Sequence, residues 1–145
     1  MHRLQSLGLV EAIRKLEQPV LGICLGMQLL FESSEEGDTP SLGLVPGRVA
    51  LLPESPGVTV PHMGWNTLDV RQASPLLRGF DAATRFYFVH SFAGPVNEFT
   101  VASCTHGTAF AAVVRRGNFW GAQFHPERSG AAGAQFLKNF LEMPA

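Results

Sequence analysis

The spacing of apolar residues at the start of the chain is helical. Leu9, Val10, Ile13 and Leu16 fall on one helical face, and most of the residues around them are charged. This pattern predicts that residues 1–18 form one amphipathic helix or two short ones. Pro19 cannot continue such a helix, so the helical region ends before it.

A short apolar run follows the proline. Val20–Ile23 is typical of a strand buried on both faces, as in a parallel sheet. Gly26–Phe31 is then expected to be a helix, and its apolar side chains share one side: Met27, Leu30 and Phe31. The next ten residues, Glu32–Ser41, are largely polar, which predicts a solvated loop.

From Gly47 onward the pattern changes to that of strands. The predicted strands are Arg48–Leu52, Val58–Val60, Thr67–Val70, Arg85–Phe92, Phe99–Thr105, Ala109–Arg115 and Asn118–Phe124. Ser74 followed by Pro75 predicts one helical turn with the serine as its cap.

A helical pattern returns at about Gly130. The apolar residues expected on its inner face are Phe136, Leu137, Phe140 and Leu141. The order of helix, strand, helix, several strands and helix predicts an α/β sheet with an antiparallel extension.

Composition and charge narrow the class of protein. The 145 residues suffice for one domain, expected over 1–145, and 46% hydrophobic against 16% charged residues indicates a globular chain. A net charge of −1 without charge runs argues against nucleic acid or an acidic membrane as the main partner. No apolar run has the length of a transmembrane helix, and no signal-peptide pattern is present. Two cysteines give neither a disulfide framework nor zinc-ligand spacing, so we expect a cytoplasmic protein without metal or cofactor.

Cys24 is the first candidate for chemistry. It stands between Gly22 and Gly26 at the predicted change from strand to helix, which is the thiol counterpart of the G-x-S-x-G nucleophile elbow. The glycines are expected where a Cβ would collide with neighbouring backbone, and the helix N-terminus is expected to favour the thiolate. The alternative is that Cys24 is a small core hydrophobe, as most cysteines in apolar runs are. The second cysteine, Cys104, lies inside a predicted strand and is interpreted as structural.

His125 and Glu127 are the second candidate. On a strand, residues two apart point to the same face, so the carboxylate can orient the imidazole. Such a histidine can offer its other nitrogen to a thiol, which is the arrangement that acyl transfer needs. An isolated His-Pro-Glu sequence would more simply be a surface turn.

A third segment groups large side chains around a glycine. It consists of Pro61, His62, Met63, Gly64, Trp65 and Asn66. Methionine and tryptophan are enriched in protein interfaces, so this presumed loop is interpreted as a contact surface. The alternative is a strand end with a buried tryptophan.

Three segments together resemble the signature segments of the class I (triad) glutamine amidotransferases. They are Gly-Ile-Cys-Leu-Gly-Met-Gln (22–28), Tyr-Phe-Val-His-Ser-Phe (87–92) and Gln-Phe-His-Pro-Glu (123–127). With Pro-His-Met-Gly-Trp-Asn (61–66) added, the sequence is most similar to the glutaminase subunits of imidazole glycerol phosphate synthases. The resemblance extends from about Leu7 to Leu141. It implies a flavodoxin-like open sheet with an antiparallel extension.

The resemblance implies that Cys24, His125 and Glu127 form a triad that hydrolyses glutamine to glutamate and ammonia. The N–H of Leu25 would supply an oxyanion donor. Gln28 and the backbone of Ser91 and Phe92 would hold the α-amino and carboxylate groups of glutamine. Glu36 would be a further contact of the amino group. The segment 61–66 would contact a cyclase subunit in a heterodimer. That partner would use the ammonia to make imidazole glycerol phosphate and AICAR in histidine biosynthesis.

The sequence departs from the family in one respect. The family carries strands and a glycine-rich loop with a second oxyanion donor before the point that corresponds to Met1, so we expect an N-terminally incomplete amidotransferase domain. A truncated gene, a shortened chain and completion by another copy are alternative explanations. Two other functions stay open: a catalytically impaired binding module, and a class I amidotransferase that serves a different synthase.

Overall fold

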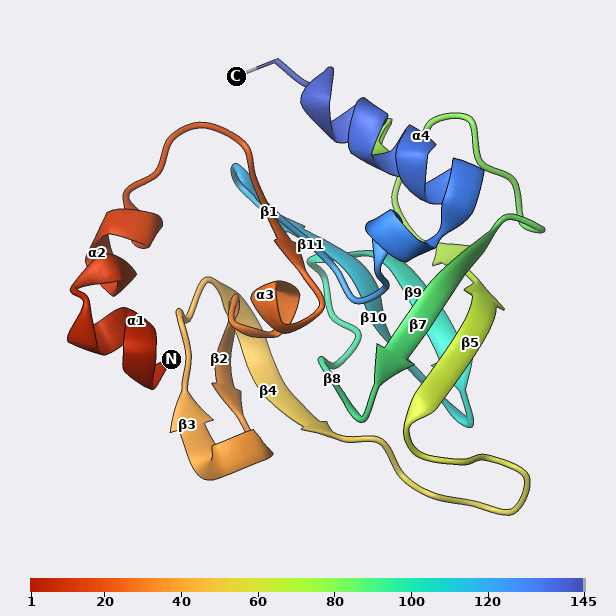
Figure 1. The fold of residues 1–145 in the computed structure, drawn as a ribbon, viewed down its shortest axis with the longest axis horizontal. Helices are drawn as coiled ribbons and strands as arrows, with labels where there is room; N and C mark the ends of the chain where they lie inside the picture. Colours follow the sequence, from red (N-terminus) through yellow and green to blue (C-terminus); the bar gives the residue numbers. More distant parts are fainter. Residues whose placement is uncertain (145) are drawn as a thin grey trace.

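The computed structural model describes residues 1–144, and a five-stranded sheet forms its centre (Figure 1). The strands, in spatial order, are β1 (Val20–Ile23), β11 (Phe119–Ala122), β10 (Thr108–Arg116), β9 (Thr100–His106) and β6 (Asp69–Val70). β1 runs parallel to β11, and every other pair in this sheet is antiparallel. The predicted combination of an α/β sheet with an antiparallel extension is confirmed.

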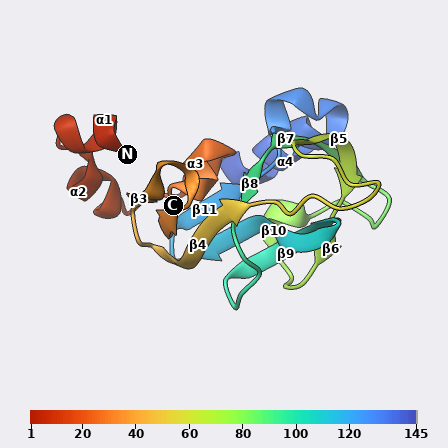
Figure 2. The ribbon, with the colours of Figure 1, turned by 90° about the horizontal axis from the view of Figure 1, so that it is seen from below.

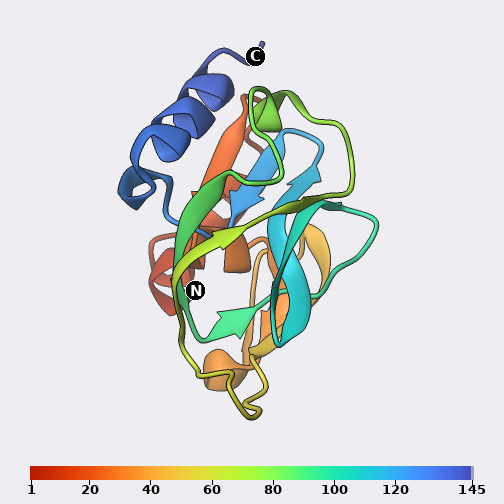
Figure 3. The same cartoon turned by 90° about the vertical axis from the view of Figure 1, so that its right-hand side faces the viewer.

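Two smaller sheets flank this centre. The first has the order β3 (Thr39–Pro40), β2 (Phe31–Ser34), β4 (Val45–Leu51) and β8 (Phe92–Ala93). The second is an antiparallel pair, β5 (His62–Thr67) and β7 (Arg85–His90), viewed from its own side in Figure 3. The β5–β7 pair matters for the site because His90, at the end of β7, is opposite His62 in register.

The helices are short except at the C-terminal end. They are α1 (His2–Ser6), α2 (Leu9–Arg14), α3 (Leu25–Gln28) and α4 (Gly130–Leu141), with 3-10 turns at Glu36–Asp38 (η1), Pro75–Leu77 (η2) and Pro126–Arg128 (η3). The first two helices confirm the predicted amphipathic region and lie to one side of the sheets (Figure 2). The helical turn at Pro75 is confirmed, and the Ser74 hydroxyl accepts a hydrogen bond from the N–H of Leu76 at 3.2 Å.

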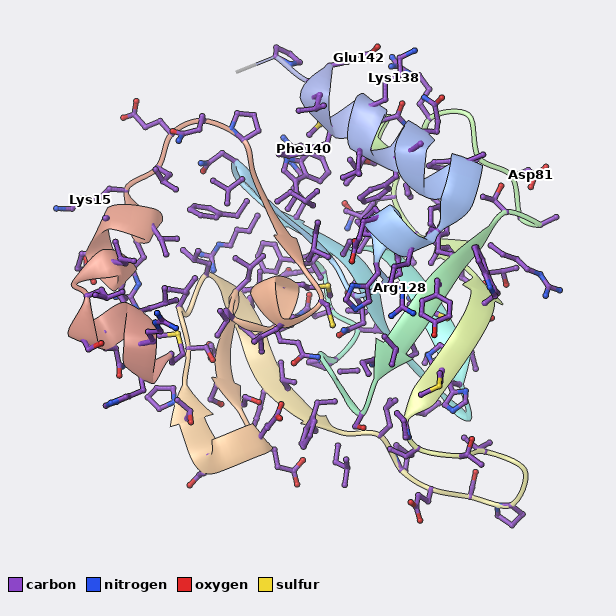
Figure 4. The ribbon with its side chains drawn as sticks, in the orientation of Figure 1. Lys15, Asp81, Arg128, Lys138, Phe140 and Glu142 are labelled. Carbon is purple, nitrogen blue, oxygen red and sulfur yellow. The ribbon has the colours of Figure 1, made fainter. Side chains whose placement is uncertain are left out.

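The larger hydrophobic cluster lies between the central sheet, β7 and α4. Phe86, Phe88, Phe124 and Phe136 are its largest fully buried side chains, and their rings meet at tilted or edge-to-face angles. The side chain of Phe140 points from α4 toward the sheet (Figure 4). A second cluster surrounds Met27 and Phe31. Residues of β11 belong to both clusters: Phe119 to the second, and Trp120 and Ala122 to the larger one.

Several sequence predictions near the elbow are wrong in extent. The helix predicted over Gly26–Phe31 is α3, which ends at Gln28, and Phe31 instead begins β2. The reason is tertiary pairing: Phe31 is opposite Val45 of β4, and the carbonyl of Leu30 accepts the N–H of Val45 at 2.8 Å. The strand Val20–Ile23 is confirmed, but it is half-buried because among residues 1–144 it pairs with β11 alone.

Other differences lie farther along the chain. The segment 32–41 contains β2, η1 and β3 rather than one solvated loop. Val58–Val60 forms no strand and only Val58 makes an isolated bridge, because prolines and a glycine interrupt the surrounding segment. In α4, Leu141 is 80% exposed, whereas Asn139 is buried and donates to the carbonyls of Leu76 and Arg78.

Within residues 1–144, no helix has the length and apolar character that crossing a membrane requires.

Candidate active site

The turn between β1 and α3 holds Cys24 in a strained conformation. Its backbone angles are φ 53° and ψ −106°, a region that residues with a side chain rarely occupy. The N–H of Cys24 donates to the carbonyl of Ala122 at 2.7 Å, and its carbonyl accepts the N–H of Gln28 at 3.1 Å. The strained turn therefore presents the thiol at the end of the sheet, as the elbow motif predicts.

The two glycines around Cys24 play different parts. A Cβ on Gly22 would lie 2.5 Å from the backbone carbon and oxygen of Gly26, so only glycine fits there. A Cβ on Gly26 would meet nothing within 4 Å. The expectation of a backbone collision is confirmed for Gly22 and is wrong for Gly26.

The surroundings of the thiol disfavour its charged form. Partial burial raises the pKa of Cys24 above its usual value, and the nearby carboxylates of Glu127 and Glu36 raise it further. Hydrogen bonds from the N–H of Leu25 and the side chain of Gln123 act in the opposite direction and do not overcome the burial. The N–H of Leu25, the first residue of α3, therefore favours the thiolate as expected, but its effect on the pKa is smaller than that of burial. A thiol of this kind needs a base.

A histidine reaches the same edge of the sheet from β11. Ile23 and Ala122 are partners in the parallel register, so Cys24 and the residues after Ala122 leave the sheet side by side. His125 follows three residues later, and its Nδ1 lies 2.6 Å from Oε1 of Glu127. The two residues belong to the start of η3 and not to a strand, so their contact is made across a 3-10 turn.

This turn is fixed from both sides. The N–H of His125 donates to the carbonyl of Tyr87 at 2.9 Å, and the carbonyl of His125 accepts the hydroxyl of Ser129 at 2.6 Å. The same Ser129 oxygen accepts the N–H of Tyr87 at 2.9 Å. These contacts with Tyr87 of β7 therefore fix the position of the turn that carries the His125 imidazole.

A hollow of about 310 Å³ opens beside the thiol. The structure places every residue expected to hold glutamine at its wall, together with the oxyanion candidate and two neighbours: Cys24, Leu25, Gln28, Glu36, Val89, His90, Ser91 and Phe92. Gln28 is buried and its Nε2 donates to the carbonyl of Phe92 at 2.9 Å and to Oε1 of Gln123 at 3.1 Å.

Sequence reasoning missed two residues of this site, Gln123 and His90. Gln123 is fully buried, and its Nε2 lies 3.7 Å from the Cys24 sulfur. A glutamine in the otherwise apolar run Phe119–Phe124 was a usable signal, because a buried amide must find polar partners. His90 ends an aromatic strand and is buried, and the same reasoning would have found it.

Residues 62–66 of the segment 61–66 lie in strand β5 and not in a loop, and they alternate in exposure. Met63 and Trp65 are 63% and 51% exposed, whereas His62 is buried. Trp65 contacts the Tyr87 ring edge-to-face at 5.9 Å, and the Arg128 guanidinium lies 4.6 Å from the centre of that ring. Figure 4 shows Arg128 beside β7. We call these four exposed or half-exposed residues the β5–β7 patch: Met63, Trp65, Tyr87 and Arg128.

Comparison with known proteins defines the class to which this fold and site belong. The family described as "Glutamine amidotransferase class-I" matches residues 2–143, so the chain belongs to the class I glutamine amidotransferases, a family of enzymes. Two solved structures agree on the fold. One is described as a glutamine amidotransferase (TM-score 0.66, 18% identity, 94% of this chain and 70% of that one), and the other is a glutamine amidotransferase of Thermotoga maritima (TM-score 0.57, 22% identity, 95% and 51%).

Particular relatives are much more similar in sequence. The protein named "Imidazole glycerol phosphate synthase subunit HisH" of Xylella fastidiosa (strain Temecula1) is 56% identical over 145 residues, which cover 100% of this chain and 72% of that protein. The protein of the same name from Xanthomonas axonopodis pv. citri is 55% identical over 143 residues, covering 99% and 72%.

Proposed function

We propose that the chain is the glutaminase subunit of an imidazole glycerol phosphate synthase and acts in the cytoplasm in histidine biosynthesis. The observation that carries this proposal is the 56% identity, over the whole chain, to a protein named as subunit HisH of that synthase. The elbow thiol and the hydrogen-bonded His125–Glu127 pair support the chemistry. The partner is a cyclase subunit, and the substrate is glutamine.

In the proposed reaction, the Cys24 sulfur attacks the side-chain amide carbon of glutamine. The thiol proton passes to Nε2 of His125, since Nδ1 is already engaged by Glu127. The N–H of Leu25 stabilises the oxygen of the tetrahedral intermediate. His125 then gives the proton to the amide nitrogen, and the C–N bond breaks. Ammonia leaves, and a γ-glutamyl thioester remains on Cys24.

A water molecule completes the cycle. His125 removes a proton from the water as it attacks the thioester carbon, and that proton returns to the departing sulfur. Glutamate leaves, and Cys24 is again a neutral thiol. Ammonia that stays out of bulk water remains unprotonated, and it passes to the cyclase subunit bound at the β5–β7 patch.

The test is glutamate release from glutamine, measured with and without the cyclase subunit. The wild type is expected to release glutamate with the partner, and Cys24→Ala to release none above background. Cys104→Ala is the matched control, because Cys104 is fully buried and lies in β9, away from the hollow. Equal rates for wild type and Cys24→Ala would refute the proposal.

The two alternative functions give different results in related measurements. A binding module without turnover would leave Cys24 unlabelled by an electrophilic glutamine analogue. An amidotransferase of another synthase would be labelled but would not bind the cyclase subunit. Labelling together with binding to the cyclase supports the proposed function.

A further inference from the structure

Two buried histidines connect strand β5 with the hollow beside the thiol, and the proposed reaction uses neither of them. His62 and His90 are 4% and 6% exposed. Nδ1 of His62 lies 3.0 Å from Nε2 of His90, and Nδ1 of His90 lies 2.9 Å from the carbonyl oxygen of Phe92. At the other end, Nε2 of His62 lies 3.3 Å from Nδ2 of Asn66.

The partners at the two ends fix the tautomers. A carbonyl oxygen can only accept, so Nδ1 of His90 carries the proton and Nε2 of His90 is an acceptor. Nδ1 of His62 must then donate to it, which leaves Nε2 of His62 to accept from the amide of Asn66. The amide of Asn66 is itself oriented, because its Nδ2 also donates to the carbonyl of Thr105 at 3.1 Å and its Oδ1 accepts the N–H of Thr67 at 2.8 Å.

Every hydrogen bond in this series therefore points the same way, from Asn66 through His62 and His90 to Phe92. The arrangement requires two neutral imidazoles. Burial and the proximity of the other histidines lower the pKa of each to about 4, so both are neutral at physiological pH. A proton added to either ring would place two N–H groups against each other.

The series of hydrogen bonds ends at the carbonyl of Phe92, a residue that lines the hollow. This carbonyl accepts hydrogen bonds from Nδ1 of His90 and from Nε2 of Gln28, each at 2.9 Å. Gln28 in turn contacts Gln123, whose Nε2 lies 3.7 Å from the Cys24 sulfur. Ser91 and Phe92 line the hollow, and the turn that contains them follows His90 directly.

We propose that His90 is a positioning residue for substrate binding: its Nδ1–H holds the Phe92 carbonyl and the Ser91–Phe92 backbone at the wall of the hollow, while His62 and Asn66 hold His90 in the required tautomer. This inference rests on the proposed function, in which that wall binds glutamine. It assigns His62, although it lies in the segment 61–66, to the inside of the site rather than to a partner surface. His90 touches no reacting atom in this scheme.

Two substitutions at His90 separate the role of its two nitrogens. In His90→Asn the amide nitrogen occupies the position of Nδ1 and can still donate to Phe92. In His90→Gln the amide reaches the position of Nε2 and leaves the Phe92 carbonyl without this donor. We expect KM for glutamine to rise about tenfold in His90→Gln, consistent with one lost buried hydrogen bond, and to change by less than about threefold in His90→Asn. A smaller change in kcat than in KM is expected for both.

His106→Gln is the matched control. His106 stacks on His62 with ring centres 4.2 Å apart, but its Nε2 is bonded to the carbonyl of Thr59, outside the series. The KM of this variant should stay within about twofold of wild type, because His106 makes no hydrogen bond to His62, His90 or Asn66. Equal KM values for His90→Gln and His90→Asn would overturn the inference.

The tautomers provide a test that does not depend on activity. Long-range ¹H–¹⁵N spectra of the ¹⁵N-histidine-labelled wild type should show both His62 and His90 protonated at Nδ1 only. Protonation of either residue at Nε2 would overturn the inference even if glutamine is hydrolysed. Conversely, the expected tautomers in a protein that releases no glutamate with the cyclase would support the hydrogen-bond series and refute the proposed function.

Discussion

Nδ1 of His125 lies 2.6 Å from Oε1 of Glu127, and the contact spans the first residues of a 3-10 turn that contains Pro126. A carboxylate can only accept a hydrogen bond, so Nδ1 of His125 carries the proton and Nε2 is unprotonated. The imidazole side chain is 21% exposed and that of Glu127 is 53% exposed, so the carboxylate orients the ring while remaining hydrated. This pairing is the geometric basis for assigning the base of the reaction to His125.

Replacing Glu127 should therefore act through the tautomer of His125. In Glu127→Gln the amide can donate to Nδ1, which would move the proton to Nε2 and remove the base. We expect kcat for glutamate release to fall by about 10²–10⁴-fold, the range of general acid–base catalysis, with a much smaller change in KM. The measurement is steady-state glutamate production in the presence of the cyclase subunit.

The control for this variant is stability. Glu127 is more than half exposed, so the urea midpoint of Glu127→Gln should match that of the wild type. A variant with an unchanged midpoint and an unchanged kcat would show that the carboxylate does not orient the base.

How far the site could be predicted depends on the kind of signal each residue gives. Cys24 and His125 stand in short motifs whose local geometry is set by neighbouring glycine or proline, so a sequence pattern suffices. Gln123 contacts Cys24 across 99 positions of the chain, and His90 is held in its tautomer by His62 across 28 positions. Such a long-range contact cannot be predicted from the spacing of residues in the sequence alone.

The fold shows the same division. The predicted strand Ala109–Arg115, which contains two β-branched residues, lies within one residue of each end of β10. The helical spacing of Met27, Leu30 and Phe31 predicts a helix that includes Phe31. Pairing with Val45 decided the outcome, since a long-range backbone ladder outweighs a short helical pattern.

The two glycines of the elbow should respond in opposite directions to the same substitution. In Gly22→Ala the new Cβ would meet the backbone of Gly26 at 2.5 Å, and backbone cannot move aside cheaply. We expect a loss of about 1–3 kcal/mol in the free energy of unfolding. Gly26→Ala places its Cβ in open space within α3, so it should be neutral or stabilising by up to about 1 kcal/mol. Urea unfolding of both variants measures the difference, and equal destabilisation would contradict this account.

The pKa of Cys24 should shift in opposite directions when its two polar neighbours are changed. Gln123→Met removes a hydrogen bond that lowers the pKa of Cys24, so the alkylation of the thiol should require higher pH. Glu36→Gln removes a carboxylate that raises the pKa of Cys24, so its alkylation profile should move to lower pH. The rate of reaction with iodoacetamide as a function of pH, located by peptide mass spectrometry, measures both. Shifts of the same sign would rule out this electrostatic description.

Stability should decrease in acid because of the buried histidine pair. The folded protein keeps His62 and His90 neutral down to a pKa of about 4, whereas in the unfolded chain both take up protons near pH 6.5. Between these pH values the unfolded state binds more protons, so the contribution is complete above about pH 6.5 and is lost as the pH falls toward 4. Each unit of difference in pKa corresponds to about 1.4 kcal/mol, so the pair should contribute a loss of a few kcal/mol.

Denaturant unfolding from pH 7 to pH 4 measures this loss. Carboxylates elsewhere in the chain titrate toward the lower end of the range, so the double variant His62→Phe/His90→Leu provides the reference. Its stability should fall less steeply between pH 6.5 and pH 4.5 than that of the wild type. Parallel curves would mean that the two histidines are not the source of the acid sensitivity.

The β5–β7 patch offers a prediction about the partner. Trp65 is half exposed on β5 beside Tyr87, and large aromatic side chains of this kind carry much of the binding energy in interfaces. We expect Trp65→Ala to weaken binding to the cyclase subunit by about 2 kcal/mol or more, roughly 30-fold in Kd. Leu141→Ala is the control, because Leu141 is 80% exposed on α4, outside the patch. Isothermal titration calorimetry distinguishes the two variants: equal Kd values for Trp65→Ala and wild type would place the cyclase on a different face, and the route proposed for ammonia would have to begin there.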